Sequence, residues 1–214
     1  MPKQNSPVPV SVANLSNATA VTAGYDYACA RVSDGSVRCW GLNAHGQLGN
    51  GSTTDSHVPV SVSGLTGVTA IDANYQHACA IVAGGSVKCW GRSEYGELGN
   101  GSTRDSSVPV SVSGISAATA VAVGSGHTCA LIGGGGVLCW GLNTNGQLGN
   151  NSTTNSLVPV SVYGISGATA IGAGPEHTCA LINDGSVKCW GWNANGQLGD
   201  NSTADGHVPV RVVF

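Results

Sequence analysis

Three histidines spaced fifty residues apart are the side chains of this sequence that could do chemistry together. His77, His127 and His177 occupy one position in successive copies of a repeated unit, and Tyr27 takes that position in the first copy. Imidazole is a common metal ligand, so repetition about an axis could build a ring of histidines that binds a metal ion or an anion. The alternative, which we favour, is a structural hydrogen bond from each imidazole to a neighbouring loop.

The other polar candidates do not assemble a catalytic site. A catalyst would be expected to break the repeat at one place and to gather an acid, a base and a nucleophile there, and the sequence shows no such break. The repeated Gly-x-x-x-x-Gly has no following Lys-Ser/Thr, so it is not a phosphate-binding loop. We therefore expect a protein that is not an enzyme, with no catalytic residue, cofactor or bound metal. A further set of repeated polar residues is expected to form turns: Asp55, Asp105, Asn155 and Asp205.

Eight cysteines form the third chemical feature, and they occur as four pairs separated by nine residues. The pairs could be disulfides, which would favour an oxidising compartment, or small buried apolar residues. Zinc is the weakest reading, because a structural zinc site needs four ligands with short spacings and each pair supplies two. The members of the pairs are Cys29 and Cys39, Cys79 and Cys89, Cys129 and Cys139, and Cys179 and Cys189.

The chain that positions these residues is a tandem repeat, and we treat residues 1–214 as one repeat domain. Each copy opens with Val-Pro-Val-Ser-Val and closes after Gly-Gln/Glu-Leu-Gly. A unit of fifty residues of this composition cannot cover its own apolar faces and must stack on its neighbours. The copies span residues 8–57, 58–107, 108–157 and 158–207, followed by a closing strand at 208–214.

Four short strands are expected in each copy, as the second copy illustrates. Residues 58–62 form an edge strand, because Pro59 cannot donate a hydrogen bond to a ladder. Residues 69–73 form a strand of small side chains, followed by strands at 77–82 and 87–90. Gly, Pro and Asn-Gly recur every eight to twelve residues without helical periodicity, which predicts an all-β fold.

The turn between the last two strands sets their register. In the first copy a three-residue turn with Gly35 in the left-handed conformation would pair Val32 with Ser36. Counting outward places Cys29 opposite Cys39 at a non-hydrogen-bonded pair, where the Cα atoms lie about 4.5 Å apart. That spacing is at the short end of the range for a disulfide. The same counting predicts that all four cysteine pairs can bridge within their own repeat.

Composition excludes two classes of partner. Charged residues make up 9% of the chain and the net charge is −3 without a basic run, so the electrostatic footprint of a nucleic-acid binder is missing. No apolar stretch approaches the length of a membrane span. Residues 1–5 are polar and do not read as a signal peptide. The paired cysteines are compatible with an extracytoplasmic bacterial parent, but the sequence leaves the localisation open.

The repeat resembles a known family. His-Thr-Cys-Ala-Leu-Ile, followed by Gly-x-Val-x-Cys-Trp-Gly-x-Asn-x-x-Gly-Gln-Leu-Gly, occurs at 127–149 and 177–199 and resembles the repeat of the regulator of chromosome condensation family, in a cysteine-containing version similar to bacterial members. The likeness covers residues 8–214. It implies a β-propeller, usually seven-bladed, with four antiparallel strands per blade. Family activities are protein recognition, including nucleotide exchange on a small GTPase and inhibition of a bacterial enzyme.

Two departures qualify this resemblance. The chain has four repeats rather than seven, and it has no insertion resembling the wedge that acts on a GTPase, so exchange activity is not carried over. Blades that begin at the small-residue strand would leave residues 8–12 as a spare edge. An open arc would expose two apolar faces, so we expect a homodimer that closes an eight-bladed ring; the alternative is a compact four-bladed monomer. The expected blades span about 18–62, 68–112, 118–162 and 168–212. The tryptophans that end the last strand of each cysteine hairpin would pack blade against blade: Trp40, Trp90, Trp140 and Trp190.

Positions that differ between the copies indicate where a partner could bind. They fall in expected loops, and loops commonly carry recognition. We therefore predict a non-enzymatic scaffold or protein-binding module, with regulation of a partner enzyme or GTPase through one face as the alternative. A repeat fragment or engineered unit whose only activity is self-assembly is also consistent with the close similarity of the copies. The loop residues of types common at binding hot spots are Tyr25, Tyr75, Arg92, Tyr95 and Trp192.

Overall fold

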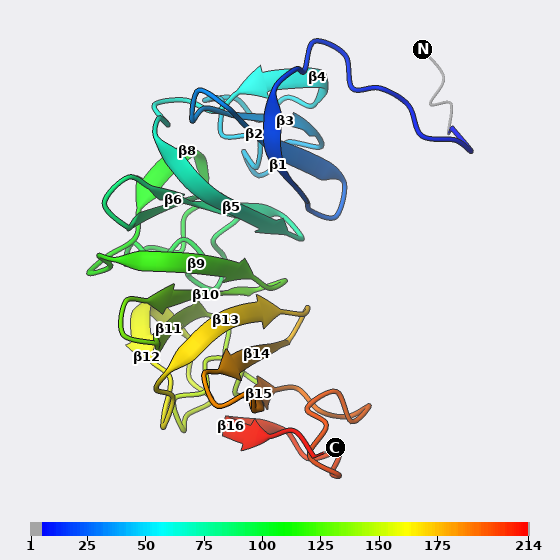
Figure 1. Cartoon of the computed structure of the whole chain (residues 1–214). Helices are drawn as coiled ribbons and strands as arrows, with labels where there is room; N and C mark the ends of the chain where they lie inside the picture. The colour runs from blue at the N-terminus through cyan, green and yellow to red at the C-terminus, as the bar shows by residue number, and fades with distance from the viewer. Residues whose placement is uncertain (1–5, 214) are drawn as a thin grey trace.

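The computed structural model describes residues 6–213, which form four antiparallel four-stranded sheets arranged along an arc (Figure 1). Each sheet is one blade, and its strands lie side by side in chain order. The all-β propeller architecture expected from the sequence is thus confirmed. By blade, the strands are β1 Ala18–Ala23, β2 Tyr27–Val32, β3 Val37–Gly41 and β4 Ser56–Ser61; β5 Val68–Asn74, β6 His77–Val82, β7 Ser86–Gly91 and β8 Ser106–Ser111; β9 Ala118–Val123, β10 His127–Ile132, β11 Gly136–Gly141 and β12 Ser156–Ser161; β13 Ala168–Ala173, β14 His177–Ile182, β15 Val187–Gly191 and β16 Gly206–Arg211.

The first strand of each blade lies where the blades converge. Strands β1, β5, β9 and β13 contact one another in sequence along the arc. Their side chains are small, which allows backbones to approach closely at a propeller axis. Asp72 on β5 ties three of them together, because its carboxylate accepts hydrogen bonds from the Thr22 hydroxyl at 3.1 Å and from the Val123 amide at 2.8 Å. The outermost strand of each blade carries the proline, as the edge assignment of Pro59 required.

The hairpin register expected from the turn is confirmed. Val32 donates its amide to the Ser36 carbonyl at 2.9 Å, Gly35 has φ of 76°, and Cys29 lies opposite Cys39. All four cysteine pairs form disulfides within their own blades, each with a Cα separation of 4.1 Å. The readings as buried thiols or zinc ligands are therefore replaced by four cross-strand bridges.

A glycine marks the point where the third strand of each blade departs from regular pairing with the fourth. In the second blade the register shifts between Cys89 and Gly91. Gly91 has φ of 101°, and a Cβ there would lie 2.4 Å from the Gln76 carbonyl oxygen. Only glycine fits this conformation and this close approach. The loop that follows is thereby brought against the loop that precedes the second strand.

Three hydrophobic cores hold the arc together, and each lies between successive blades. One blade contributes its disulfide and a valine, and the next contributes a tryptophan and an alanine of its second strand. Trp90, Trp140 and Trp190 are fully buried in these cores, which confirms their expected role in packing blade against blade. Trp40 differs, because it belongs to the first blade and is partly exposed.

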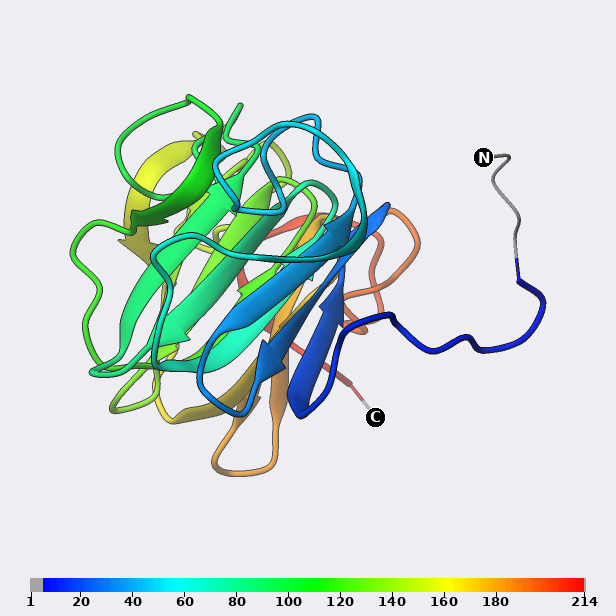
Figure 2. The same ribbon diagram turned by 90° about the horizontal axis from the view of Figure 1, so that it is seen from above.

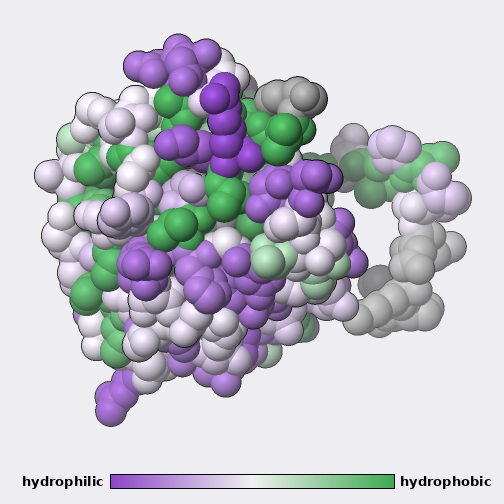
Figure 3. Space-filling model, turned by 90° about the horizontal axis from the view of Figure 1, so that it is seen from below, coloured by the Kyte–Doolittle hydropathy of each residue, from purple (hydrophilic) through white to green (hydrophobic). Residues whose placement is uncertain are grey.

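The arc is open rather than closed on itself. The first and fourth blades lie at its two ends (Figure 1), and the buried clusters of the described chain join only neighbouring blades. The structure therefore differs from the compact four-bladed monomer considered as an alternative. Figure 3 views the molecule from the side of the fourth blade and shows hydrophobic side chains interspersed with polar ones on this end.

The N-terminal Val-Pro-Val segment corrects one expectation. Residues 8–12 form no strand and are exposed, and the segment runs away from the blades (Figure 2). Its counterparts β4, β8, β12 and β16 each pair with the third strand of a blade whose residues precede them. Among residues 6–213 no third strand of a blade pairs with residues 8–12. The predicted absence of a signal peptide concerns residues 1–5, and the last residue of the predicted closing strand is 214; both lie outside the described residues.

The contribution of the second blade's disulfide to stability can be tested. A cross-link that closes a loop of about ten residues is expected to stabilise a fold by about 3 kcal/mol. We expect the double variant Cys79→Ala/Cys89→Ala to lower the free energy of unfolding by about that amount, measured by chemical denaturation. An unchanged unfolding free energy would show that this bridge contributes nothing to stability.

Candidate functional site

The loops that vary between copies gather on one face of the arc. In each blade the loop between the first two strands and the long loop between the last two lie at the same end of the sheet, because the strands are antiparallel. A backbone bond joins the two loops in each blade, as from the Arg92 amide to the Gln76 carbonyl at 3.0 Å. We call this the loop face. The tight glycine turns of the cysteine hairpins lie on the opposite face.

Four of the five residues predicted for partner binding meet on the loop face. The rings of Tyr25 and Tyr75 have centroids 5.7 Å apart and are tilted by 60°. The guanidinium of Arg92 lies 5.7 Å from the centroid of Tyr75 and 5.5 Å from that of Tyr95. We call these four residues the aromatic patch. They come from the first two blades and form one continuous cluster.

Local backbone geometry positions this patch. Tyr75 has φ of 34°, an uncommon conformation for a bulky residue, and its amide donates to the Asn74 side chain at 2.7 Å. The Tyr75 carbonyl accepts the Tyr25 amide at 3.0 Å, which joins the loops of two blades. Tyr25 itself remains 72% exposed. The patch thus exposes the aromatic ring of Tyr25 to solvent, while hydrogen bonds fix the backbone that carries it.

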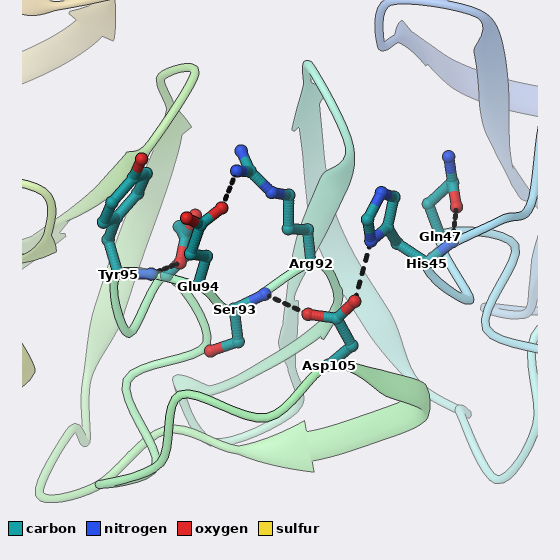
Figure 4. A network of polar contacts seen from close by, with 8 residues as sticks. His45, Gln47, Arg92, Ser93, Glu94, Tyr95 and Asp105 are labelled. Atoms are coloured by element: carbon teal, nitrogen blue, oxygen red, sulfur yellow. Dashed lines mark hydrogen bonds and ion pairs between the residues drawn. The ribbon is translucent and has the colours of Figure 1, made fainter.

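Charges beneath and beside the patch complete its electrostatics. Arg92 pairs with Glu94, and both side chains point to the same side of the loop as Tyr95 (Figure 4). Glu97 of the same loop is fully buried. One of its carboxylate oxygens accepts the Tyr95 amide at 2.7 Å, while the other has no hydrogen-bond partner. Burial raises the pKa of Glu97.

A second polar link on the same face joins the first two blades. The Nδ1 atom of His45 lies 2.7 Å from a carboxylate oxygen of Asp105, whose other oxygen accepts the Ser93 amide at 2.8 Å (Figure 4). Asp55, Asn155 and Asp205 accept the corresponding backbone amides in their own blades. The expectation that these residues stabilise turns is therefore confirmed.

Trp192 does not belong to the aromatic patch. It lies in the fourth blade, in the position that Arg92 holds in the second, and it is partly buried. Its amide donates to the Glu176 carbonyl at 2.9 Å. The neighbouring Asn145 amide side chain donates to the Glu176 carboxylate at 2.9 Å. Trp192 thus shares the loop face with the patch but is separated from it along the arc.

The histidine register is a ladder between blades. The Nε2 atom of His77 lies 2.9 Å from the Thr128 hydroxyl, and that of His127 lies 2.8 Å from the Thr178 hydroxyl. In the first copy the Tyr27 hydroxyl donates to the His77 carbonyl at 2.5 Å. The structural reading is therefore the right one for His77 and His127, although the partner is a strand of the next blade rather than a loop. Within residues 6–213 no three histidine, cysteine, aspartate or glutamate side chains cluster as metal ligands would.

Burial sets the protonation of this ladder. Desolvation lowers the pKa of His77 to about 3, with smaller contributions from His127 and Arg92, and it lowers the pKa of His127 to about 3 as well. Both rings are neutral at neutral pH.

No helix in the described part of the chain is long and apolar enough to cross a membrane.

Sequence comparison decides the family. Models of the regulator of chromosome condensation (RCC1) repeat match residues 34–81, 84–131, 134–181 and 184–214, and a second model of the same repeat matches 18–47, 68–97, 118–147 and 168–197. This chain belongs to the RCC1 repeat family. A comparison with curated protein sequences gives no significant match.

Several solved structures share the fold of this chain. Human WBSCR16 superposes with a TM-score of 0.82 at 28% identity, over 92% of this chain and 53% of that protein. Yeast RCC1 (Prp20), solved with Kap60 bound, superposes with a TM-score of 0.84 at 19% identity, over 95% of this chain and 50% of that protein. Prp20p from Saccharomyces cerevisiae, described together with its binding properties to Gsp1p and histones, gives a TM-score of 0.82 at 20% identity over 95% and 52%. The chain thus spans about half the length of these three proteins.

The neutral histidine ladder predicts a specific pH dependence. A histidine with a pKa near 6.5 when unfolded and about 3 when folded favours the folded state above pH 6.5, and this contribution is lost as the pH falls toward 3. Between pH 7 and pH 5 one such histidine lowers the free energy of unfolding by about 2 kcal/mol. The amide of His77→Gln does not titrate. Between pH 7 and pH 5 we therefore expect the unfolding free energy of this variant to fall by about 2 kcal/mol less than that of wild type, measured by chemical denaturation.

The matched control for this pH test is His207→Gln, at an exposed histidine. It should retain the pH dependence of the wild-type protein. If the unfolding free energy of His77→Gln falls as much as that of wild type between pH 7 and pH 5, burial does not keep the His77 ring from being protonated.

Proposed function

We propose that this RCC1-repeat chain is a protein-binding module that recognises its partner through the aromatic patch on the loop face. We further propose that a second copy completes the ring that carries this face. Regulation of an enzyme or a GTPase through the loop face would be one form of this partner binding. The observation that supports partner binding is the convergence of Tyr25, Tyr75, Arg92 and Tyr95 from two blades.

The physical chemistry of the patch supports recognition of a protein segment. Tyr and Arg are common at binding hot spots. Tyr offers a large contact area at a low cost in side-chain entropy, and Arg offers several hydrogen-bond donors. The exposed ring of Tyr25 has apolar faces for a hydrophobic side chain. Arg92 retains guanidinium donors beyond its pairing with Glu94, and these suit a carboxylate. The patch therefore fits a peptide segment that carries an acidic and an apolar residue.

A binding experiment with a defined probe tests this proposal. Peptides selected from a phage-displayed random library on the wild-type protein should lose affinity roughly 30-fold on Tyr25→Ser, the loss typical of a hot-spot residue. Isothermal titration calorimetry with the selected peptides measures this loss. Enrichment of acidic residues among the selected peptides is also expected.

Tyr163→Ser is the matched control for the patch, because Tyr163 is an exposed tyrosine, 67% accessible, outside the patch. Peptide affinity should be unchanged in this variant. Selected peptides that bind Tyr25→Ser as tightly as wild type would contradict the patch as the recognition site. So would equal losses in both variants.

The proposed ring follows from the uncovered ends of the arc. Blades of this kind bury a large apolar surface against each neighbour, and exposed faces of that kind are typical of interfaces. Two copies joined end to end would supply eight blades and leave no end uncovered. Light scattering on a size-exclusion peak should therefore give about 43 kDa, twice the chain mass of 21.3 kDa. A mass near that of one chain would contradict the ring and leave the patch proposal standing.

A further inference from the structure

We infer that the two copies join through a plug-and-socket seam, in which the turn around Gly196 of one copy enters the pocket lined by Asp26, Gly41, Leu42, Asp55 and His57 of the other. This inference rests on the two-copy ring proposed above and names the contacts that build it. Each ring would contain two such seams. The chain already forms three interfaces of this kind between its own blades.

The three internal interfaces use the same three hydrogen bonds. The first runs from the amide at the start of a blade to a turn glycine of the preceding blade, as from Val68 to Gly35 at 3.0 Å. The second runs from the tryptophan indole to a backbone carbonyl of the preceding blade, as from Trp90 to Gln47 at 2.9 Å. The others of these two kinds are Ala118 to Gly85 at 2.9 Å, Ala168 to Gly135 at 3.0 Å, Trp140 to Glu97 at 2.7 Å and Trp190 to Gln147 at 2.9 Å.

The third hydrogen bond runs in the opposite direction along the arc. The amide after the Gly-Gln/Glu-Leu-Gly turn donates to a carbonyl at the start of the next blade's outer strand. These bonds join Gly51 to Ser107 at 2.8 Å, Gly101 to Leu157 at 2.9 Å and Asn151 to His207 at 2.9 Å. Every internal interface is therefore fixed by donors from both blades.

The two ends of the arc carry the unmatched halves of these bonds. By register, the first blade presents the Ala18 amide, the Trp40 indole and the His57 carbonyl. The fourth blade presents the Gly185 carbonyl, the Gln197 carbonyl and the Asn201 amide. Within residues 6–213 the Trp40 indole and the Asn201 amide donate no hydrogen bond, and the Ala18 amide donates none outside its own sheet. Each donor at one end thus meets an acceptor at the other, so a second copy in the same orientation would restore all three bonds.

The turn glycines contact the next blade at each internal interface, and the last of them has no such contact. At the internal interfaces the turn glycine touches the next blade closely: a Cβ on Gly46 would lie 2.5 Å from the Ser107 Cα atom, and one on Gly146 would lie 2.7 Å from the His207 Cα atom. At Gly196 the only atom of residues 6–213 within 4 Å of such a Cβ, apart from the adjacent residues, is the carbonyl oxygen of Ser202 in its own loop, at 3.8 Å. The plug is therefore free at the end of the fourth blade.

The socket lies at the other end. In the second blade the residues at two of the corresponding positions, Asp105 and Ser107, are contacted by the His45–Gly46 turn of the first blade. In the first blade the same positions line an open pocket. A second open pocket surrounds the plug itself and is lined by Gly196, Gly199 and Asn201, among others. These two cavities stand where the internal interfaces are filled.

Apolar side chains at the two ends of the arc are more exposed than their counterparts at the internal interfaces. Leu181 faces away from the third blade and is 42% exposed, whereas its counterparts Ile81 and Leu131 are 2% and 4% exposed in internal cores. Val21 at the opposite end is 73% exposed, and its counterpart Ile71 packs into a core. The seam would cover both. The occupant that these ends fit is therefore another copy of this chain.

A substitution at the plug tests the seam. Gly196 has φ of 74°, which asparagine tolerates better than other side chains, so Gly196→Asn should fold while its side chain blocks the socket. We expect this variant to have the mass of one chain by light scattering, while wild type has the mass of two. The matched control is Gly114→Asn, where φ is 67° and no atom lies within 4 Å of an added Cβ, and it should keep the mass of two chains.

A second variant keeps the test independent of folding at position 196. Trp40→Phe keeps an aromatic side chain but removes the indole N–H donor. Because the eight-bladed ring contains two seams, it would lose two such hydrogen bonds. The dimer dissociation constant should rise roughly 30-fold, measured by sedimentation equilibrium. An unchanged constant would overturn the assignment of Trp40 to the seam.

The outcomes separate the seam from the ring. If wild type and Gly196→Asn both have the mass of two chains, the seam is wrong and the two-copy ring stands. If wild type has the mass of one chain, the ring and the seam both fail, and peptide binding to the aromatic patch remains to be judged by its own experiment. A mass that grows beyond two chains with concentration would overturn ring closure.

Discussion

The interface between blades is the constraint on which the whole structure depends. A four-stranded blade of about forty-five residues leaves two faces to be covered, and the tryptophan that covers one of them carries an N–H group into a dry environment. Burying that donor is tolerable only if it is hydrogen-bonded, and the preceding blade supplies a backbone carbonyl at 2.7 to 2.9 Å. Packing and polar satisfaction are thus met by the same neighbour, which is why no blade is complete alone.

This dependence explains how the loop face acquires its geometry. The blades fix the ends of the loops, and hydrogen bonds such as those from the Tyr25 amide to the Tyr75 carbonyl fix the loops to one another. Residues fifty positions apart therefore become neighbours. Tyr25 and Tyr75 meet for this reason, and Arg92 reaches Tyr75 because the glycine before it forces the third strand against the loop of its own blade.

Much of the fold could be predicted from the sequence because its determinants are local. The turn ending in Gly35 fixes the pairing of Cys29 with Cys39, and the period of fifty residues repeats that pairing. The convergence of Tyr25, Tyr75, Arg92 and Tyr95 could not be predicted, since it depends on the angle between blades. The buried Glu97 is visible only as a departure from glutamine in its register, and nothing in the sequence shows that it is buried within range of the Arg92 charge. The Val-Pro-Val segment at residues 8–12 was misjudged because its strand character is not intrinsic and arises only from pairing with an earlier blade.

All four disulfides join strands of the same blade, and this has an evolutionary consequence. A duplication or deletion of fifty residues in register would leave every remaining cysteine with its own partner, and every tryptophan that follows another blade would still find a backbone carbonyl in that blade. Blade number can therefore change by whole steps without stranding a thiol or requiring a compensating substitution. A propeller cross-linked between blades would not have this freedom. In this chain covalent bonds define the inherited unit, and non-covalent contacts between units set how many are assembled.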